Sequence, residues 1–417
     1  MTQPEIAWGE GPGPGYPALA ARFRPVFERI REGAIGREAG RLLPAEPIRW
    51  LKEAGFTRAR LPVAEGGFGA STSDLFALLI ELSAADSNVT QALRAHLGLV
   101  EDIVGLPDGP RRQTWAARIA AGETIGSAWS ETGTAPIEGF ATRLTASGQG
   151  YRLDGRKFYT TGSLFADWID VGATFETADG PTAVAVSVRR EAPGVEVIDD
   201  WDGFGQTGTA SGTAIFTGVA LAADDFVIEE GRFGYAPAFY QLVHLATLAG
   251  IGRAISQELA ALVHARTRIY SNGAGPQSRL DPQVLQVVGK VRGAAYAASA
   301  IVLQVARALD RAFAARLSGQ PAAPAPGSAT LSAVEIAELE TSQALPVVSS
   351  LILDAATVLF DALGASSTRK SLQLDRHWRN ARTLASHNPR IYKDRIVGDY
   401  AVNGTPPPDQ WRIGTPA

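Results

Sequence analysis

The sequence of 417 residues contains no cysteine, which excludes disulfide bonds, thiolate metal sites and cysteine nucleophiles. Histidine is scarce and occurs only at positions 96, 244, 264, 377 and 387. No two of these positions have the HxH or HExxH spacing of a metal site. No run approaches the roughly eighteen uncharged apolar residues of a membrane span. The N-terminus lacks the basic and apolar regions of a signal peptide. The formal net charge of −4 suggests neither a nucleic-acid partner nor a membrane partner. Together these features lead us to expect a cytoplasmic protein with no metal.

The order of sequence patterns predicts three domains. Hydrophobic residues make up 45% of the chain, which suffices for a large core and more than one domain. Residues 18–124 show helical spacing of apolar side chains. Residues 125–235 contain alternating runs such as TAVAVSVRR, separated by Gly, Asp and Thr. Residues 236–417 contain long alanine-rich helical segments. We therefore expect an α+β, mostly α fold: a helical N-terminal domain, a central antiparallel β-domain, and a C-terminal four-helix bundle with a tail.

Two segments of the β-domain combine aromatic rings with hydroxyl groups, as a planar cofactor requires. GSAWSETGT, which starts at Gly126, places Trp129 beside Ser130. GRKFYTTGSLFADW, which starts at Gly155, surrounds a glycine with hydroxyl side chains and flanks them with aromatic ones: Tyr159, Thr160, Thr161, Ser163 and Phe165. A core tryptophan in the first segment and a threonine-rich strand and turn in the second are the alternative interpretations.

Other candidates lie further along the chain. Trp201 stands in a glycine-rich loop, where it can wall a pocket or simply anchor the loop. Arg266 or Arg268, and Arg369 after a helix break, are candidates for binding an anion, although most arginines lie on the surface.

The best catalytic candidate is His387. It stands where a helix is expected to end, before Asn388-Pro389. A histidine in that position can point into a cavity, and its ordinary pKa suits proton transfer near neutral pH. His96 lies on an amphipathic helix, where packing is the alternative role.

In this order, the segments AWSETG, GRKFYTTGS and DALGASST resemble the acyl-CoA dehydrogenase superfamily, from about Phe23 to about Gly404. The closer resemblance is to its flavin-dependent monooxygenases, typified by dibenzothiophene monooxygenase and the dimethylsulfone-type enzymes. It is carried by KFYTTGSLFADW, DDWDGFGQTGTASGT and ARTLASHNP. The resemblance implies that Thr161 contacts the flavin ring. It also implies that the segment with Ser367 and Arg369 binds the distal part of the cofactor, often across a subunit interface.

One departure from the parent family bears on the chemistry. Acyl-CoA dehydrogenases need a carboxylate base, commonly in a Glu-Gly-Thr that follows an Arg-Asp-Ala. Here the sequence Arg379-Asn380-Ala381 is followed by His387-Asn388-Pro389, and no Asp or Glu occurs between Asp375 and Asp394. The usual base is therefore missing, although Glu258 on another helix is an alternative.

The resemblance then implies a two-component monooxygenase. It would use O2 and reduced FMN, with FAD as the alternative, and a separate NAD(P)H:flavin reductase would supply the flavin. A C4a-(hydro)peroxyflavin, bonded by His387, Ser163 and His96, would oxygenate a small apolar, aromatic or organosulfur substrate. The predicted substrate pocket consists of Phe165, Trp201, Phe204, Ser211 and Asn388, and the predicted assembly is a homotetramer. An acyl-CoA dehydrogenase or nitroalkane-type oxidase, and a non-catalytic flavin-binding relative, remain the alternatives.

Overall fold

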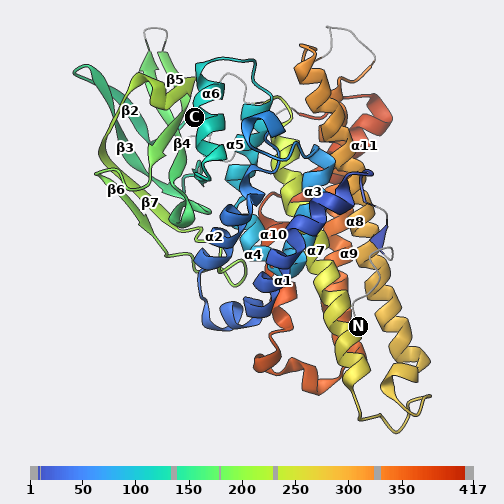
Figure 1. Cartoon of the computed structure of the whole chain (residues 1–417). Helices are drawn as coiled ribbons and strands as arrows, with labels where there is room; N and C mark the ends of the chain where they lie inside the picture. Colours follow the sequence, from blue (N-terminus) through green and yellow to red (C-terminus); the bar gives the residue numbers. More distant parts are fainter. Residues whose placement is uncertain are drawn as a thin grey trace.

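The protein has a β-sheet on one side, a layer formed by the N-terminal helices in the middle and the long C-terminal helices on the other side (Figure 1). The computed structural model describes residues 8–9, 11–132, 139–177, 180–228, 233–323 and 330–408. The end of the segment GSAWSETGT, part of the proline-rich loop near residue 325 and the last nine residues lie outside these ranges.

The first helices form the middle layer. Their bounds are α1 Tyr16–Gly40, α2 Ala45–Ala54, α3 Thr72–Ala85, α4 Ser87–Ala92, α5 Arg94–Val104 and α6 Pro110–Ala120. Helix α3 begins with a capping box, in which the Ser71 hydroxyl and the Asp74 carboxylate each accept a hydrogen bond from the other residue's backbone N–H. Nearly all of α3 is buried because it packs between α1 and the long helix α7 (Ala236–Ala265). A single residue, Leu93, interrupts the helical path between the end of α4 and the start of α5.

The central domain is a mixed sheet. Its strands are β1 Ile125–Ala128, β2 Arg143–Ser147, β3 Gly150–Phe158, β4 Trp168–Thr177, β5 Gly180–Arg189, β6 Val195–Ile198, β7 Thr213–Leu221 and β8 Phe226–Ile228. The order is β6-β7-β3-β2-β4-β5-β8, with β1 paired to β4. Both β1 and β2 run parallel to β4, while the other described pairings are antiparallel. The predicted antiparallel sheet is therefore corrected to a mixed one, because β1 and β2 lie end to end along one edge of β4.

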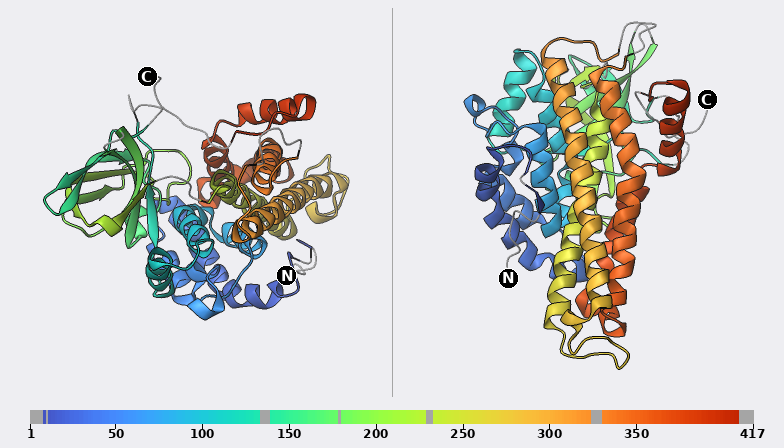
Figure 2. Two further views of the ribbon diagram at one scale, coloured as in Figure 1. Left: turned by 90° about the horizontal axis from the view of Figure 1, so that it is seen from above. Right: turned by 90° about the vertical axis from the view of Figure 1, so that its right-hand side faces the viewer.

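The C-terminal part consists of long helices that run side by side (Figure 2). They are α7, α8 Pro282–Leu317 and α9 Ala333–Val358, joined by α10 Asp375–Ser386 and α11 Lys393–Asn403. Helix α8 begins where Asp281-Pro282 predicts it, and the Asp281 side chain accepts from the Gln283 N–H at 2.9 Å.

One segment of this bundle, Ala333–Ala362, is apolar and long enough to cross a membrane by length and composition alone. The sequence did not indicate a span here, because carboxylates interrupt the segment. In the structure α9 packs against α7 and α8, so a bundle helix accounts for its composition.

One hydrophobic core joins the middle layer to the bundle, and the sheet has a separate core. The shared core includes Phe23, Leu78, Phe239, Val302 and Leu345. The two layers of helices are thus fixed against each other. Where the three parts meet, Gly162 after β3 lies against Ala92 of α4, and Gln91 of α4 contacts His244, whose ring lies beside that of His387 at the end of α10.

Candidate active site

Two glycines allow the turn after β3 to lie very close to neighbouring backbone. Gly162 has a φ of +80°, and a Cβ on it would lie 2.1 Å from the carbonyl oxygen of Ala92 at the end of α4. A Cβ on Gly126 of β1 would lie 2.4 Å from the Cα of Ser163. Larger residues cannot be accommodated at either position without shifting the backbone. Ser163 is therefore fixed between β1 and α4.

The hydroxyl groups of this turn already have partners. Ser163 Oγ donates to the carbonyl of Ser127 at 3.0 Å, and Thr160 Oγ1 donates to the carbonyl of Gly212 at 2.9 Å. Thr161 Oγ1 and Ser211 Oγ lie 2.7 Å apart, and Ser211 continues the chain to Thr209 at 2.7 Å. Since hydroxyl protons rotate, the Thr161–Ser211 pair can redirect a donor toward a ligand. Ser163 would have to release Ser127 to act as the predicted donor.

The predicted aromatic residues are open to solvent to different degrees. Trp129 is half-buried, and its indole N–H donates to Asp170 at 2.7 Å, while Ser130 is exposed. The ring of Tyr159 is exposed and packs edge-on against Trp201 at 5.7 Å. Phe165 is half-buried against the main core. Trp129, Tyr159 and Trp201 thus offer accessible ring surface on the sheet side.

An ion pair that the sequence analysis missed holds the Trp129 segment in place. Lys157 is fully buried, and its Nζ lies 2.6 Å from Glu131 Oε1 and 3.4 Å from the Trp129 carbonyl. Burial lowers the pKa of Lys157 to about 8, although Glu131 partly opposes the shift. The two residues are 26 positions apart, so spacing along the sequence gave no sign of the pair.

His387 caps the end of α10, as predicted, and Asn388 fixes its tautomer. Asn388 donates through its amide nitrogen to Gln241 Oε1, so its oxygen, 3.1 Å from His387 Nδ1, accepts the Nδ1 proton. His387 Nε2 is then an acceptor. Burial, followed by the charge of Arg94, lowers the pKa of His387 to about 4. Its side chain is nevertheless exposed, so the ring borders space that water reaches while protein surrounds it on most sides. At neutral pH this is an uncharged, accessible acceptor.

A second histidine, which sequence reasoning assigned to packing, lies against the first. The ring centroids of His244 and His387 are 4.3 Å apart. His244 Nε2 is 3.2 Å from the amide nitrogen of Gln91 on α4. Among the described residues, His244 Nδ1 and Gln91 Oε1 are buried without a hydrogen-bond partner. The only sequence signal was a polar residue inside the apolar run of α7.

His96 has a different environment from His387. It is buried, and its Nε2 lies 2.7 Å from the carbonyl oxygen of Thr57. This contact links the segment with Thr57 to α5. Its pKa is lowered to about 4, mainly by burial, and the charges that act on it are those of Lys52 and Asp167. Arg94, which faces His387, is two residues earlier on α5 and therefore about 200° away around the helix. The hydrogen-bond partner of His96 in the described structure is the Thr57 carbonyl, and its predicted role beside His387 stays a prediction.

Phe204, predicted to line the substrate pocket, lies elsewhere. Its ring is exposed and stacks on Trp378 at 5.9 Å. Nine residues separate Trp378 from His387, which corresponds to about 13 Å along a helix. Phe204 therefore packs on the middle of α10 rather than beside His387.

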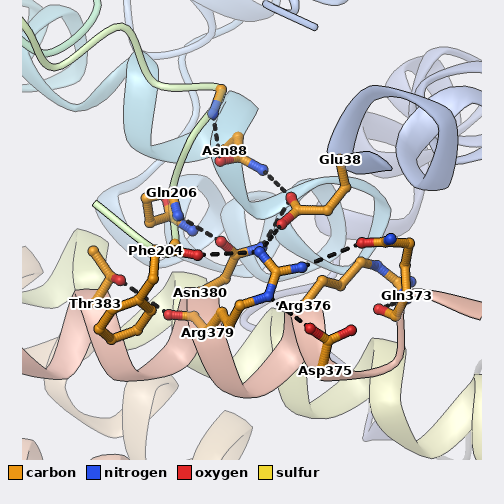
Figure 3. A network of polar contacts seen from close by, with 12 residues as sticks. Glu38, Asn88, Phe204, Gln206, Gln373, Asp375, Arg376, Arg379, Asn380 and Thr383 are labelled. Atoms are coloured by element: carbon orange, nitrogen blue, oxygen red, sulfur yellow. Dashed lines mark hydrogen bonds and ion pairs between the residues drawn. The ribbon is translucent and has the colours of Figure 1, made fainter. Parts of the chain in front are cut away.

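The backbone carbonyl of Phe204 belongs to a polar network that holds α10 in place (Figure 3). Arg379 donates to Glu38 of α1 at 2.8 Å and to the carbonyl of Phe204 at 3.1 Å. The neighbouring Asn380 accepts from the backbone N–H of Gln206 at 2.5 Å. Residues of the middle layer, of the loop before β7 and of α10 thus meet in one cluster. The network fixes the helix that carries His387 at its end.

The anion candidates Arg266 and Arg268 and the predicted distal residues Ser367 and Arg369 lie before α10 in the chain, away from His387 at its end. Arg266 donates to the carbonyls of Ala362 and Leu363, and its Nε to the carbonyl of Arg268. Ser367 Oγ donates to the Gly364 carbonyl at 2.6 Å, while Arg369 is exposed, with Nε 3.2 Å from the Ser366 carbonyl. Helix α10, with 12 residues, separates this group from His387 by about 18 Å.

Glu258, the alternative base, is engaged in ion pairs. It contacts Arg376 and lies 3.1 Å from His377 Nε2. Burial alone would raise the pKa of Glu258, but His377 and Arg376 outweigh it and lower the pKa to about 2. Within the described part of the chain, the side chains that shift the pKa of His387 are Arg94 and Asn388, and none is a carboxylate.

Comparisons with known proteins agree with this architecture. Residues 20–123 match the family described as acyl-CoA dehydrogenase, N-terminal domain, and residues 242–389 match acyl-CoA dehydrogenase, C-terminal domain. The probable FMNH2-dependent monooxygenase SfnC of Pseudomonas putida is 25% identical over 94% of this chain and 97% of its own length. Dibenzothiophene monooxygenase of Mycolicibacterium goodii is 27% identical over 85% of this chain and 86% of its own.

Solved structures show the same fold. Methanesulfinate monooxygenase MsuC from Pseudomonas fluorescens superimposes with a TM-score of 0.84 at 24% identity, over 94% of this chain and 98% of that one. FMN-bound TdsC from Paenibacillus sp. A11-2 gives a TM-score of 0.85 at 22% identity, over 94% and 99%.

Proposed function

Because the chain belongs to the acyl-CoA dehydrogenase superfamily, and its curated relatives include FMNH2-dependent and dibenzothiophene monooxygenases, we propose that it is a flavin-dependent monooxygenase. Its cofactor is FMN, which arrives reduced from a separate NAD(P)H:flavin reductase. Its co-substrate is O2, and its product is an oxygenated small molecule.

The observation that carries this proposal is the group at the end of α10. A dehydrogenase of this fold needs a carboxylate base whose pKa lies near the working pH. In the described structure that place holds His387, uncharged and with Nε2 free to accept. The alternative base, Glu258, is held ionised by Arg376 and His377. These facts favour oxygenation over removal of a proton from a thioester.

The residues present fit a flavin. Half-exposed Trp129 and exposed Tyr159 offer ring surface, and the Thr161–Ser211 pair offers a hydroxyl that can rotate. When bound, reduced FMN supplies the reaction with O2 through a C4a-(hydro)peroxyflavin. The part of His387 in our proposal is to accept a hydrogen bond or a proton at Nε2 while Asn388 holds its orientation. Exclusion of water around this site would favour oxygen transfer over loss of H2O2.

The proposal includes a homotetramer. Large apolar side chains are exposed on the bundle, among them Ile269, Tyr270, Leu285, Tyr296 and Val347. The segment with Arg369 precedes α10 and His387 ends it, one helix length of about 18 Å later, so in our proposal a second copy supplies such an arginine to the same flavin. A monomer mass of 44.0 kDa in light scattering at micromolar concentration would reject this assembly.

Two experiments on the same preparation test the function. In the first, chemically reduced FMN, O2 labelled with oxygen-18 and a panel of organosulfur and aromatic amine compounds are supplied, and we expect label in a product. In the second, oxidised FMN-loaded protein is mixed anaerobically with acyl-CoA thioesters and nitroalkanes. Bleaching of the flavin by these compounds, without labelled product in the first experiment, would favour the dehydrogenase or oxidase alternative.

A further inference from the structure

Arg94 is held in one orientation by Tyr240, near the contacting rings of His244 and His387. It is the first residue of α5, its Nε donates to the carbonyl of Tyr240 at 3.1 Å, and its guanidinium carbon lies 4.7 Å from the centre of the Tyr240 ring. Tyr240 is one turn before His244 on α7. The His244 ring centroid in turn lies 4.3 Å from that of His387, and the charge of Arg94 lowers the pKa of both histidines.

A glycine makes room for the ring beneath Arg94. Gly98 follows Arg94 by one turn of α5, and a Cβ at Gly98 would lie 2.2 Å from the Tyr240 hydroxyl oxygen. The ring can therefore lie across α5 only because position 98 has no side chain. The backbone carbonyl and the ring face together fix the guanidinium, which is the arrangement of a built binding site rather than of a mobile surface arginine.

The charge of Arg94 has no counter-ion in the described structure. No carboxylate within the described ranges lies within ion-pair distance of it, whereas Arg60 pairs with Glu101 and Arg37 with Asp86, each at 2.8 Å. Burial lowers the pKa of Arg94 to about 10, so it stays protonated at neutral pH. A partly buried cation without a partner is costly, and an anion that enters the site would relieve that cost.

A second donor lies near the guanidinium. With the Gln91 amide nitrogen donating to His244 Nε2, the uncharged ring carries its proton on Nδ1, which is buried and has no partner among the described residues. The Nη atoms of Arg94 make no hydrogen bond within the described residues, so Arg94 and His244 each offer an unused donor. Together they match the several acceptor oxygens of an oxyanion.

We propose that Arg94, with His244 beside it, binds the anionic group of the substrate, which is a small oxyanion such as a sulfinate, sulfonate or carboxylate. This inference rests on the proposed function, because it places the oxyanion next to His387 and the flavin. It narrows the substrate class expected from the sequence, which was apolar, aromatic or organosulfur, to compounds that carry an oxyanion. The apolar part of the molecule then lies against the aromatic surface of the sheet side.

The test compares an anion with a neutral compound of similar shape. Benzenesulfinate and methyl phenyl sulfone are titrated calorimetrically into protein loaded with oxidised FMN. We expect the wild type to bind the sulfinate at least about tenfold more tightly, and Arg94→Gln to weaken sulfinate binding about tenfold to a hundredfold. The sulfone and FMN should bind within about twofold of wild type, because neither depends on this charge in our proposal.

The control variant is Arg49→Gln, which removes an exposed arginine from α2 and should behave as wild type. Arg94→Lys keeps the charge but loses the planar fork, so sulfinate binding should lie between the wild type and Arg94→Gln. This second variant keeps the test decisive if Arg94→Gln fails to fold.

Three results would overturn the proposal. The first is equal binding of sulfinate and sulfone to the wild type, and the second is an unchanged preference for the sulfinate in both Arg94 variants. The third is a loss of FMN affinity instead of sulfinate affinity, which would assign Arg94 to the cofactor. The titration needs no turnover, so its failure is separable from failure of the monooxygenase reaction, which is measured with reduced FMN and O2.

Discussion

Replacing His387 by alanine should uncouple oxygen consumption from substrate oxygenation. The change removes the ring whose Nε2 is the accessible acceptor at the end of α10 and leaves Asn388 and Gln241 in place. Flavin binding should change little, because the ring surfaces and hydroxyls of the sheet side remain. Oxygen uptake with reduced FMN should continue, and H2O2 should replace the oxygenated product.

The expected size follows from the loss of one hydrogen-bonding group at a reacting centre, which typically slows the step about 100-fold to 1,000-fold. If transfer outruns loss of H2O2 about tenfold in the wild type, a transfer step slowed about 100-fold leaves roughly one product per ten O2 consumed. Asn388→Ala keeps the ring but frees its orientation. We expect that variant to lie between His387→Ala and the wild type.

The assay supplies chemically reduced FMN and a substrate from the panel, then measures H2O2 and product per O2 consumed. His264→Ala is the matched control, since His264 is exposed near the end of α7. A fully coupled His387→Ala variant would refute the role of this residue. Slower flavin reduction by substrate, without extra H2O2, would instead indicate a dehydrogenase.

Further predictions concern the cofactor, stability and the buried ion pair. Arg369→Ala should weaken FMN binding about tenfold to a hundredfold through the loss of one charge-assisted contact; an unchanged Kd in titration calorimetry rejects the assignment. Burial holds the pKa of His96 at about 4 in the folded state, against about 6.5 unfolded. The unfolded state thus binds more protons between these values, and about 3 kcal/mol of stability present above pH 6.5 is lost as the pH falls to 4. Urea unfolding of His96→Gln should show a shallower pH dependence over that window, and an identical slope contradicts the burial argument. Lys157→Met should leave Glu131 buried without its cation and weaken FMN binding by displacing Trp129; normal folding and FMN affinity together would argue against that positioning role.

The fold was predictable where local signals and long-range packing agree. Asp281-Pro282 marks the start of α8 because Asp281 caps it and proline suits a first turn. His387 ends α10, as the following Asn-Pro indicates. The parallel pairing of β1 and β2 with β4 could not be seen, because alternation of side chains is the same in parallel and antiparallel strands.

The site was predictable only in part, because its contacts join distant positions. Composition pointed to the turn from Thr160 to Ser163, and helix-end position pointed to His387; their roles stay predictions. Arg94 and His244 were missed, since each matters through residues more than 140 positions away. A single sequence does not reveal such contacts. The stacking of Phe204 on Trp378 could not be foreseen either, because nothing in the sequence of its loop indicates it.

The most direct test of the central claim is rapid mixing of the protein and reduced FMN with O2 under single-turnover conditions. Our account predicts an absorbing C4a adduct, distinct from oxidised FMN, that accumulates without substrate. A compound that carries an oxyanion should speed its decay and appear oxygenated. Reoxidation of the flavin in one phase, as for free FMN in solution, with all O2 recovered as H2O2, would contradict the assignment as a monooxygenase.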